Sequence, residues 1–363
     1  MLAVTVLTYP EMTRAPLAGS SSGILRPLRA KAPLRISFAG GGTDVQPFPR
    51  QEGGLVLSAT IDRFAYGSLR PRDDGQITIE SVDYGTSIDF GIKDPLLFDG
   101  KLDLVKAVIR KLGGPEQGGY DLLLHSSAPP GSGLGSSSTV MVCLIGLLNE
   151  RYNLKLTAYE VAHLAYVVER EELGIKGGLQ DQYSATFGGF NFMEFDGDSI
   201  VVNPLRISED TISELEHNML LAYTGITRAS SEIIDDQTGR LEAGAEETLA
   251  GLRAQKVLAV QMKAALLRNQ LSLFGELLGE AWEQKKRMSP KITNGYIDEI
   301  YAAARANGAL GGKVTGAGGG GYVLLYCDFH KKHKVVDTLR DMGATIEEFG
   351  FARRGLVTWH AGH

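Results

Sequence analysis

A run of glycines and serines near the middle of the chain has the composition of a phosphate-binding loop. Its nine residues are Pro130, Gly131, Ser132, Gly133, Leu134, Gly135, Ser136, Ser137 and Ser138. The glycines let the backbone wrap closely around oxygen atoms, and free N–H groups at the start of a following helix favour negative charge. The loop therefore predicts a polyphosphate site. In the alternative interpretation it is a flexible loop in which Ser136 or Ser137 is an ordinary helix N-cap.

The spacing within this loop excludes the two commonest nucleotide-binding motifs. A Walker-type loop needs Ser or Thr after Gly-Lys, but Leu102 and Val314 follow the Gly-Lys pairs of this chain. A dinucleotide motif counted from Gly131 would need a glycine where Ser136 stands, and the prolines before it are not a strand exit. The loop indicates phosphate binding by another kind of fold.

Two further glycine-rich segments follow or precede predicted strands. Residues 39–44 come directly after a strand-like alternation over residues 34–38, and residues 313–321 precede a predicted strand at residues 322–327. Glycine accounts for 45 of 363 residues, above a typical share of roughly 7%, and the excess is concentrated in a few loops. Such loops permit positive φ or a close backbone approach to a ligand.

The elements that must position these loops form an α+β pattern. Other strands are predicted at residues 55–61, 65–70, 76–81, 120–125, 188–195 and 219–224, and helices at residues 102–112, 139–148, 158–172, 245–286, 297–305 and 333–341. Residues 139–148 are apolar nearly all round, which predicts a buried helix fed by the glycine and serine loop. A break in the long helix is expected at Asn269 and Gln270.

Length, charge and cysteine content narrow the class of protein. A chain of 363 residues has room for two hydrophobic cores. The formal net charge of -6 gives no broad reason to bind nucleic acid or an anionic membrane, and no apolar run approaches the roughly 20 residues of a membrane helix. Cys143 and Cys327 are too few for a disulfide framework or a cysteine metal site. We expect a soluble, cytoplasmic protein.

The three glycine-rich segments resemble the three motifs of the GHMP small-molecule kinases, the superfamily of galactokinase, homoserine kinase, mevalonate kinase and phosphomevalonate kinase. Residues 32–44, 130–138 and 313–321 lie in the family order. The resemblance implies ATP and Mg²⁺ as cofactors and a two-domain α+β fold with the active site in the cleft between the domains. We expect a loose extension at residues 1–30, a ribosomal-S5-like N-terminal domain with the nucleotide and sugar loops at residues 31–210, and a ferredoxin-like C-terminal domain at residues 211–363.

Within this superfamily, residues 32–44 and 53–62 are similar to D-glycero-D-manno-heptose 7-phosphate kinases. Galactokinases carry Glu-His where this chain has Gly41 and Gly42, and the smaller residues suit a longer sugar. The resemblance implies phosphorylation of the anomeric C1 hydroxyl to the 1,7-bisphosphate, for nucleotide-heptose and surface polysaccharide synthesis. A fucose or galactose kinase and a catalytically idle sugar and nucleotide sensor are the alternatives. A homodimer is expected only because dimers are common.

The resemblance also assigns roles to single residues. Asp181 would accept or orient the proton of the attacking hydroxyl, and Arg35 would neutralise charge on the transferring phosphoryl group. Ser137 and Glu169 would hold Mg²⁺ through oxygen atoms. The alternative interpretations are that Asp181 only forms a turn, that Arg35 is an exposed cation on a strand, and that the glutamates lie on a solvated helix face. One residue more separates Gly174 from Asp181 than in mevalonate kinases, so Glu171 and Glu172 remain alternatives to Glu169.

The sugar site is expected to contain residues of the first and third motifs and a separate cation. The motif residues are Gly41, Gly42, Thr43, Asp44, Gly318 and Gly319. An acceptor that already carries a phosphate needs an Arg or Lys away from the reacting hydroxyl. Arg228 ranks first because hydroxyl-bearing residues surround it in the sequence, and Lys176 and Lys285 are further candidates. For each of these cations, an ordinary surface charge is the simpler alternative.

Overall fold

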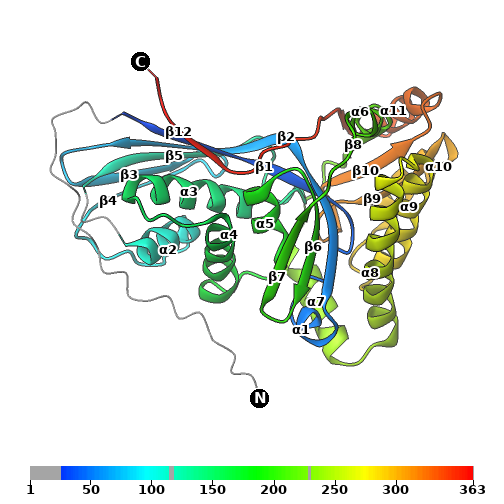
Figure 1. The fold of residues 1–363 in the computed structure, drawn as a ribbon, viewed down its shortest axis with the longest axis horizontal. Coiled ribbons are helices and arrows are strands. Elements are labelled where there is room, and N and C mark those ends of the chain that lie inside the picture. The colour runs from blue at the N-terminus through cyan, green and yellow to red at the C-terminus, as the bar shows by residue number, and fades with distance from the viewer. Residues whose placement is uncertain (1–25, 114–117, 228–229, 363) are drawn as a thin grey trace.

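The computed structural model describes residues 26–113, 118–227 and 230–362. These residues form two β-sheets with helices packed against them. In Figure 1 the larger, N-terminal sheet lies on the left, and the smaller sheet lies on the right beside the long C-terminal helices. The α+β class predicted from the sequence is confirmed.

The larger sheet has eight strands. Six of them run in the order β12 (Val357–His360), β1 (Leu28–Ala39), β2 (Gly54–Pro71), β5 (Tyr120–Ser126), β3 (Gln76–Ser81) and β4 (Thr86–Gly91). β6 (Phe190–Asp196) pairs with β2, and β7 (Ser199–Pro204) pairs with β6. The sequence predicted two strands where the structure has the single strand β2. Its first part pairs with β6 and its second part with β5, so the neighbour changes while the strand continues.

Helices cover one face of this sheet, as Figure 1 shows. They are α2 (Asp103–Leu112), α3 (Ser136–Tyr152), α4 (Ala158–Tyr166) and α5 (Gln180–Phe187), with a π-helical segment at Val167–Glu172 after α4 and a short α1 (Phe48–Glu52) after β1. α3 packs against β1 and β2, and 12 of its 17 residues are buried. The prediction of a buried helix directly after the glycine and serine loop is confirmed.

The smaller sheet has four strands, in the order β11 (Thr345–Glu347), β8 (Met219–Tyr223), β10 (Tyr322–Cys327) and β9 (Ala309–Val314). Its helices are α6 (Glu209–Asn218), α7 (Ser230–Glu242), α8 (Glu246–Leu267), α9 (Leu271–Lys286), α10 (Gly295–Ala306) and α11 (Lys332–Asp341). The predicted break between α8 and α9 is confirmed, since Asn269 has φ of +55°. Sequence patterns did not predict α5 and α7, although both contribute residues to a cavity between the glycine-rich loops.

One apolar core joins the two sheets. It contains residues of β1, β2 and β6 together with residues of α8, α9, β8 and β10. The ring of Phe38 in β1 lies 5.1 Å from the ring of Phe274 in α9 and 6.3 Å from that of Phe190 in β6. The strands that carry the first motif are therefore packed directly against the C-terminal helices.

The C-terminal end of the chain returns to the N-terminal sheet. β12 pairs antiparallel with the first residues of β1, from Leu28 opposite His360 to Lys31 opposite Val357. Among the described residues, regular structure thus begins at Leu28, and residues 357–360 of the C-terminal part of the chain extend the N-terminal sheet.

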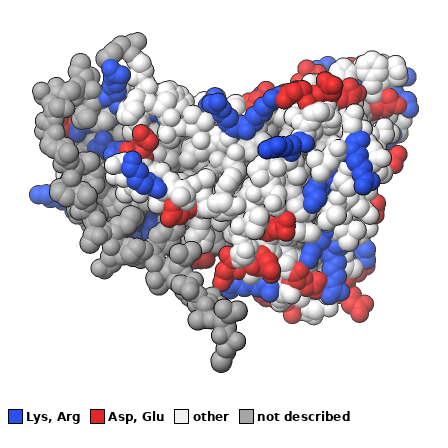
Figure 2. Space-filling model, in the orientation of Figure 1, with Lys and Arg blue, Asp and Glu red and all other residues white. Residues whose placement is uncertain are grey.

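The surface has no broad region of one charge on the face drawn in Figure 2. Lys and Arg side chains lie beside small groups of Asp and Glu side chains around a largely uncharged middle. Within the described ranges, no helix combines the length and the apolar character needed to cross a membrane.

Candidate active site

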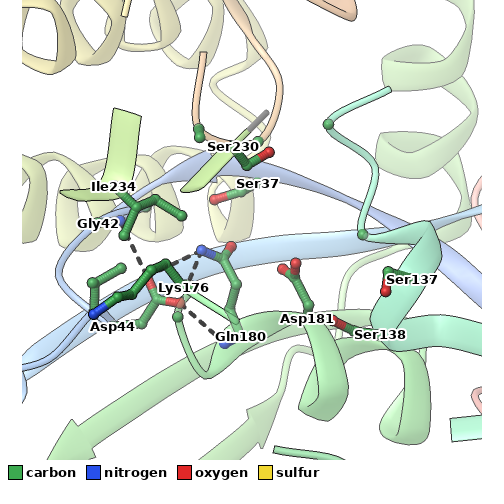
Figure 3. Close-up of a pocket in the computed structure, with 18 of the residues that line it drawn as sticks. Ser37, Gly42, Asp44, Ser137, Ser138, Lys176, Gln180, Asp181, Ser230 and Ile234 are labelled. Carbon is green, nitrogen blue, oxygen red and sulfur yellow. Dashed lines mark hydrogen bonds between the residues drawn. The ribbon is translucent and has the colours of Figure 1, made fainter. Parts of the chain in front are cut away.

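A cavity of about 290 Å³ lies where the three glycine-rich loops meet. Residues of β1, of the loops after β1, β5 and β9, of α5, α7 and α9, and of the segment between the π-helical turn and α5 line it. In Figure 3, Asp181 lies between Asp44 and Lys176 on one side and Ser137 and Ser138 on the other. The tertiary structure therefore brings together residues that are up to 282 positions apart in the sequence, between Arg35 and Ala317.

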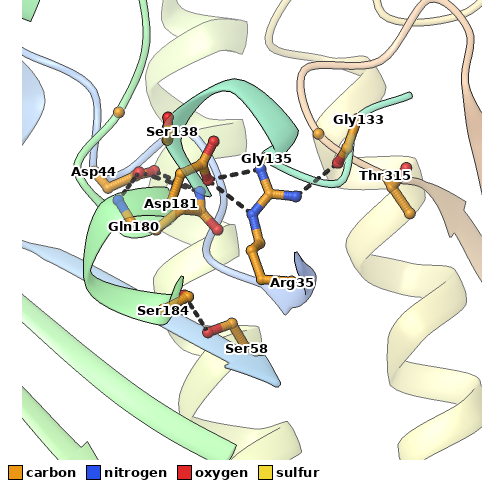
Figure 4. Close-up of polar contacts among 12 residues, drawn as sticks. Arg35, Asp44, Ser58, Gly133, Gly135, Ser138, Gln180, Asp181, Ser184 and Thr315 are labelled. Carbon is orange, nitrogen blue, oxygen red and sulfur yellow. Dashed lines mark hydrogen bonds and ion pairs between the residues drawn. The ribbon is translucent and has the colours of Figure 1, made fainter. Parts of the chain in front are cut away.

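Arg35 and Asp181 form an ion pair at the centre of this cavity (Figure 4). Nε and a terminal nitrogen of Arg35 each lie 2.7 Å from Oδ1 of Asp181, and Nη1 donates to the carbonyl of Gly133 at 2.6 Å. The Arg35 side chain is 5% exposed, which excludes an exposed strand cation. Asp181 belongs to the first turn of α5 rather than to a loop. An ideal Cβ on Gly135 would stand 3.4 Å from Asp181 Oδ2, so this carboxylate lies directly against the phosphate loop.

The loop over residues 130–138 has the geometry that its glycines predict. Gly131, Gly133 and Gly135 have φ of 77°, 79° and 76°, a region that favours glycine. Gly135 is the N-cap of α3 and no side chain caps this helix, so the alternative in which Ser136 or Ser137 is an ordinary N-cap is wrong. Gly131, Gly133, Gly135, Ser136, Ser137 and Ser138 line the cavity.

The other residues of this segment lie elsewhere. Leu134 belongs to the core shared by the two sheets, and its carbonyl accepts the N–H of Arg35 at 3.1 Å. Pro130 lines a second cavity. Ser132 is buried, and its carbonyl accepts the hydroxyl of Thr315 at 3.2 Å. These contacts hold the loop between β1 and the third motif.

Glu169 points into the site from the π-helical turn. It is 2% exposed, and its Oε2 accepts hydrogen bonds from Ser138 at 2.6 Å and from Gln182 at 2.7 Å, while Ser137 Oγ lies 3.4 Å from Oε1. Glu172 instead pairs with Lys111 at 2.6 Å outside the cavity. Of the three candidate glutamates, only Glu169 lines the cavity in the described structure, and it is not on a solvated helix face.

The residues around Ser137 and Glu169 fit a divalent cation that takes most of its ligands from a nucleotide. Hydroxyl and carboxylate oxygens are the hard donors that Mg²⁺ prefers. Nowhere in the described ranges do three or more His, Cys, Asp or Glu side chains form a metal-binding group. A cation held here would therefore need phosphate and water oxygens to complete its coordination.

Asp44 is fully buried on the opposite side of the cavity from the serines. Its carboxylate accepts the backbone N–H of Gln180 at 3.0 Å, the side-chain amide of Gln180 at 3.1 Å and the N–H of Gly42 at 3.1 Å. Burial raises the pKa of Asp44, the N–H of Gln180 opposes this, and the nearby Asp181 carboxylate raises the pKa further. Gly178 makes room for the group, since a Cβ there would stand 2.0 Å from Asp44 Oδ2.

Some residues expected at the sugar are placed differently by the structure. Thr43 does not line the cavity, because its buried hydroxyl donates to the carbonyl of Gly40 at 2.7 Å and accepts the N–H of Leu55 at 3.0 Å. Thr43 therefore holds the first loop in shape. Gly318 and Gly319 pack against Ile292 and also lie outside the lining. The third motif lines the cavity through Gly316 and Ala317 instead.

The three candidate cations have different environments. Arg228 lies outside the described residues. Lys176 lines the cavity, but its side chain is 59% exposed and its Nζ lies 3.8 Å from Asp235 Oδ1. Lys285 also lines the cavity and is 4% exposed.

The structure adds cavity residues that the sequence analysis did not single out. They are Ser37, Val45, Arg170, Ile175, Gly177, Gly178, Gln180, Ser230, Ser231, Ile234 and Gln237. The last four belong to α7, which follows β8. The alternation of β1 could have indicated Ser37, because it lies two residues after Arg35 and so on the same side of the strand.

A second cavity of about 410 Å³ adjoins the first. Ser136, Ser137 and Ile175 line both cavities. Its other walls come from the β3–β4 turn, the start of α2 and α3, with apolar side chains at Leu102, Leu104, Val140, Met141 and Leu173. Pro130, Ser136 and Ser137 of the glycine and serine loop line one side of this cavity, whereas its apolar walls carry no motif and are brought together by packing.

Comparison with known proteins gives the family. The GHMP kinases N terminal domain matches residues 102–189, and the GHMP kinases C terminal domain matches residues 262–345. A D-glycero-alpha-D-manno-heptose 7-phosphate kinase from Campylobacter jejuni subsp. jejuni serotype O:2 is 40% identical over 339 residues, which cover 92% of this chain and 99% of that protein.

Solved structures agree with this result. A D-glycero-D-manno-heptose 1-phosphate kinase from Bacteroides thetaiotaomicron is 33% identical with a TM-score of 0.77, covering 93% of this chain and all of that one. A putative sugar kinase from Campylobacter jejuni is 38% identical with a TM-score of 0.77, covering 94% of this chain and all of that one. Since the similarity extends over almost the whole length of each protein, the chain belongs to the GHMP kinase family.

Proposed function

We propose that this chain transfers the γ-phosphate of ATP to the anomeric C1 hydroxyl of D-glycero-D-manno-heptose 7-phosphate, giving the 1,7-bisphosphate for nucleotide-heptose and surface polysaccharide synthesis. The ion pair of Arg35 and Asp181 against the phosphate loop is the observation that carries this proposal, because it puts a carboxylate beside the position of a terminal phosphate. We expect the reaction to occur in the cytoplasm.

The two adjoining cavities divide the substrates between them. The larger cavity, with apolar walls from α2 and α3, would hold the nucleoside, and the loop over residues 131–138 would hold the phosphates with its N–H groups and the start of α3. The smaller cavity would then hold the acceptor. Ser136 and Ser137, which line both, stand where the transferring phosphate would pass.

The residues at the centre would act mainly through position and charge, as in phosphoryl transfer generally. Asp181 would accept or orient the proton of the C1 hydroxyl. Arg35, held by Asp181 and by the Gly133 carbonyl, would face the charge that develops on the phosphoryl group. Ser137 and Glu169 would hold Mg²⁺, which would supply positive charge that neutralises the phosphates of ATP.

The sugar would occupy the space between Asp181 and Asp44. The buried Asp44 carboxylate and Gln180 offer hydrogen bonds to sugar hydroxyls, and Gly41 and Gly42 line the same cavity. The names of the similar proteins include both a 7-phosphate and a 1-phosphate kinase, and both acceptors would lead to the same bisphosphate.

An acceptor panel tests the proposed function. ADP release is measured with heptose 7-phosphate, heptose 1-phosphate, unphosphorylated heptose, fucose and galactose. We expect the highest kcat/KM with heptose 7-phosphate. A higher value with fucose or galactose would replace the proposed acceptor, and ligand binding without ADP release from any sugar would indicate a sensor.

Replacement of Asp181 tests the mechanism. Asp181→Asn keeps the shape of the side chain but removes its charge, so we expect kcat to fall by roughly a thousandfold, with ATP affinity changed less than threefold. Glu194→Gln, a matched change at a residue exposed on β6, serves as the control for the loss of one carboxylate. Near-normal turnover in the Asp181 variant, with circular dichroism like that of the unchanged protein, would contradict this role.

A further inference from the structure

Lys285 is a buried ammonium group that faces the acceptor cavity. It lies in the last turn of α9, is 4% exposed, and lines the cavity beside Gly316 of the third motif. Its Nζ donates to the carbonyl of Gly316. Across the part of the chain that the structure describes, no carboxylate lies within 4.0 Å of this nitrogen, whereas buried charges are normally paired.

Ser37 supplies a second polar group that lacks a partner in the same cavity. The residue is 5% exposed, and its hydroxyl has no hydrogen-bond partner among residues 26–113, 118–227 and 230–362. An ideal Cβ on Gly41 would stand 3.4 Å from Ser37 Oγ. Ser37 lines the cavity and no side chain at residue 41 covers its hydroxyl, and a buried hydroxyl left without a partner is costly.

The other cations of the cavity are already engaged. Arg35 pairs with Asp181 and with a carbonyl, and Arg170 lies 3.4 Å from Glu169 and donates to three loop carbonyls. Lys176 is largely exposed and lies near Asp235. Lys285 is thus the buried cation in the described lining whose positive charge no carboxylate neutralises.

Electrostatics also favour an anion beside Lys285. Burial lowers the pKa of Lys285 to about 8, the nearby Arg35 adds to this effect, and the Asp44 carboxylate opposes it. An anion in the cavity would stabilise the charged form of Lys285 and so offset the effect of burial on its pKa. Binding of the anion and protonation of Lys285 would therefore favour each other. Because Lys285 lines the cavity, a bound ligand can supply the negative charge that no described carboxylate supplies.

We propose that the Lys285 ammonium and the Ser37 hydroxyl bind the phosphate group that the sugar acceptor already carries. This inference rests on the proposed function and names the group that recognises a phosphorylated acceptor. Arg35 and Ser37 point to the same side of β1 and stand about 7 Å apart along it. Because Asp181, Arg35, Ser37 and Lys285 line one cavity, an acceptor bound there would place its C1 hydroxyl at the Asp181–Arg35 pair and its phosphate at Ser37 and Lys285.

Two single variants and one control test the inference. Lys285→Met keeps the length of the side chain and removes the charge, Ser37→Ala removes the hydroxyl, and Lys176→Met removes the exposed cation of the same cavity. Steady-state kinetics with heptose 7-phosphate and with unphosphorylated heptose give the preference for the phosphorylated acceptor as a ratio of kcat/KM values, and the KM for ATP is measured alongside.

We expect Lys285→Met to raise the KM for heptose 7-phosphate at least tenfold and to reduce the preference ratio by the same factor, with the KM for ATP and the activity on unphosphorylated heptose changed less than threefold. Ser37→Ala should have a smaller effect in the same direction, and Lys176→Met should change the ratio less than twofold. An equal fall in kcat for both acceptors with an unchanged ratio would overturn the inference, because Lys285 would then act on the transferring phosphate. Loss of the ratio in the Lys176 variant alone would also overturn it.

A binding measurement separates this inference from the proposed function. Thermal unfolding is followed in inorganic phosphate, with chloride at the same ionic strength as the reference. A rise in Tm of the unchanged protein that Lys285→Met abolishes and Lys176→Met preserves supports the anion site even if heptose 7-phosphate is not a substrate. An equal rise in all three proteins would contradict it.

Discussion

Two lysines close to Arg35 have buried ammonium groups. Lys285 donates to the carbonyl of Gly316 and Lys313 donates to that of Phe38, the latter at 3.2 Å. Burial lowers the pKa of Lys313 well below its usual range, and the positive charges of Lys285 and Arg35 add to this effect. Only Lys285 of the two lines the cavity. Lys313 instead stabilises the end of β1 through its hydrogen bond to the Phe38 carbonyl.

The burial of Lys285 predicts a stability that depends on pH. Its folded-state pKa of about 8 lies below the ordinary value of 10.5. Between these values the unfolded chain binds more protons, so the free energy of unfolding rises with pH in this window, and the cost of burying the ammonium is fully present below pH 8. Arg35, Asp44 and Lys313 are the charged groups that interact with the Lys285 ammonium. Lys285→Met removes the ammonium and with it the free-energy cost of burying a charge.

We expect Lys285→Met to raise the free energy of unfolding at pH 7 by on the order of 3 kcal/mol without ligand, with a smaller gain at pH 10. Urea unfolding of both proteins at the two pH values measures this difference. An equal loss of stability at pH 7 and pH 10 would show that packing, and not charge, decides the effect at this position.

At the scale of elements, the π-helical turn at Val167–Glu172 decides which glutamate enters the site. Glu169 faces Ser137 and Ser138, while Glu172 pairs with Lys111 on the outside. Glu169→Gln should raise the Mg²⁺ concentration that gives half-maximal activity by at least tenfold, because a neutral amide is a weaker ligand for a hard cation. Activity is titrated with Mg²⁺ at fixed ATP.

Glu172→Gln is the matched control for this turn, and we expect it to change the Mg²⁺ requirement less than twofold. If the Glu172 variant shows the larger shift, Glu172 and not Glu169 would be the ligand of Mg²⁺. A fall in maximal activity at all Mg²⁺ concentrations without a shift would assign Glu169 to holding Ser138 and Gln182 in place.

At the scale of the whole molecule, the two ends of the chain and the two sheets are tied together. β12 pairs with the start of β1, and Leu356 just before it packs over Gly146 of α3. The apolar core shared by β1, β6 and α9 connects the sheets. We therefore expect one cooperative unfolding transition that loses stability when β12 is removed.

Deletion of residues 357–363 should lower the urea midpoint, because it removes the backbone hydrogen bonds of β12 and uncovers the first residues of β1. Deletion of residues 362–363 alone keeps this strand and also the hydrogen bond from Ala361 to Pro27, so it should leave the midpoint unchanged. Unfolding is followed by fluorescence and circular dichroism together. An unchanged midpoint in the longer deletion would mean that the edge of the sheet is stable without β12.

The sequence alone determined the local features of this protein. Positive φ at Gly131, Gly133 and Gly135, the buried helix that follows them and the break at Asn269 all depend on residue type and near neighbours, so patterns in the chain were enough. The three motifs in order also indicated the family. The placement of Arg35 beside Asp181 was expected from that resemblance, not from periodicity.

The tertiary structure decided which side chains reach the cavity. Thr43, Ser37 and Gly318 all belong to the motifs, but only Ser37 lines the cavity, while Thr43 and Gly318 contact the backbone around them. Lys285 was one of three candidate cations, and its burial in the cavity lining could not be read from the residues around it. β12 likewise joins a sheet whose other strands end about 150 residues earlier, at Pro204. Such facts depend on contacts between distant segments, because burial and orientation are set by packing and not by the residues next in the chain.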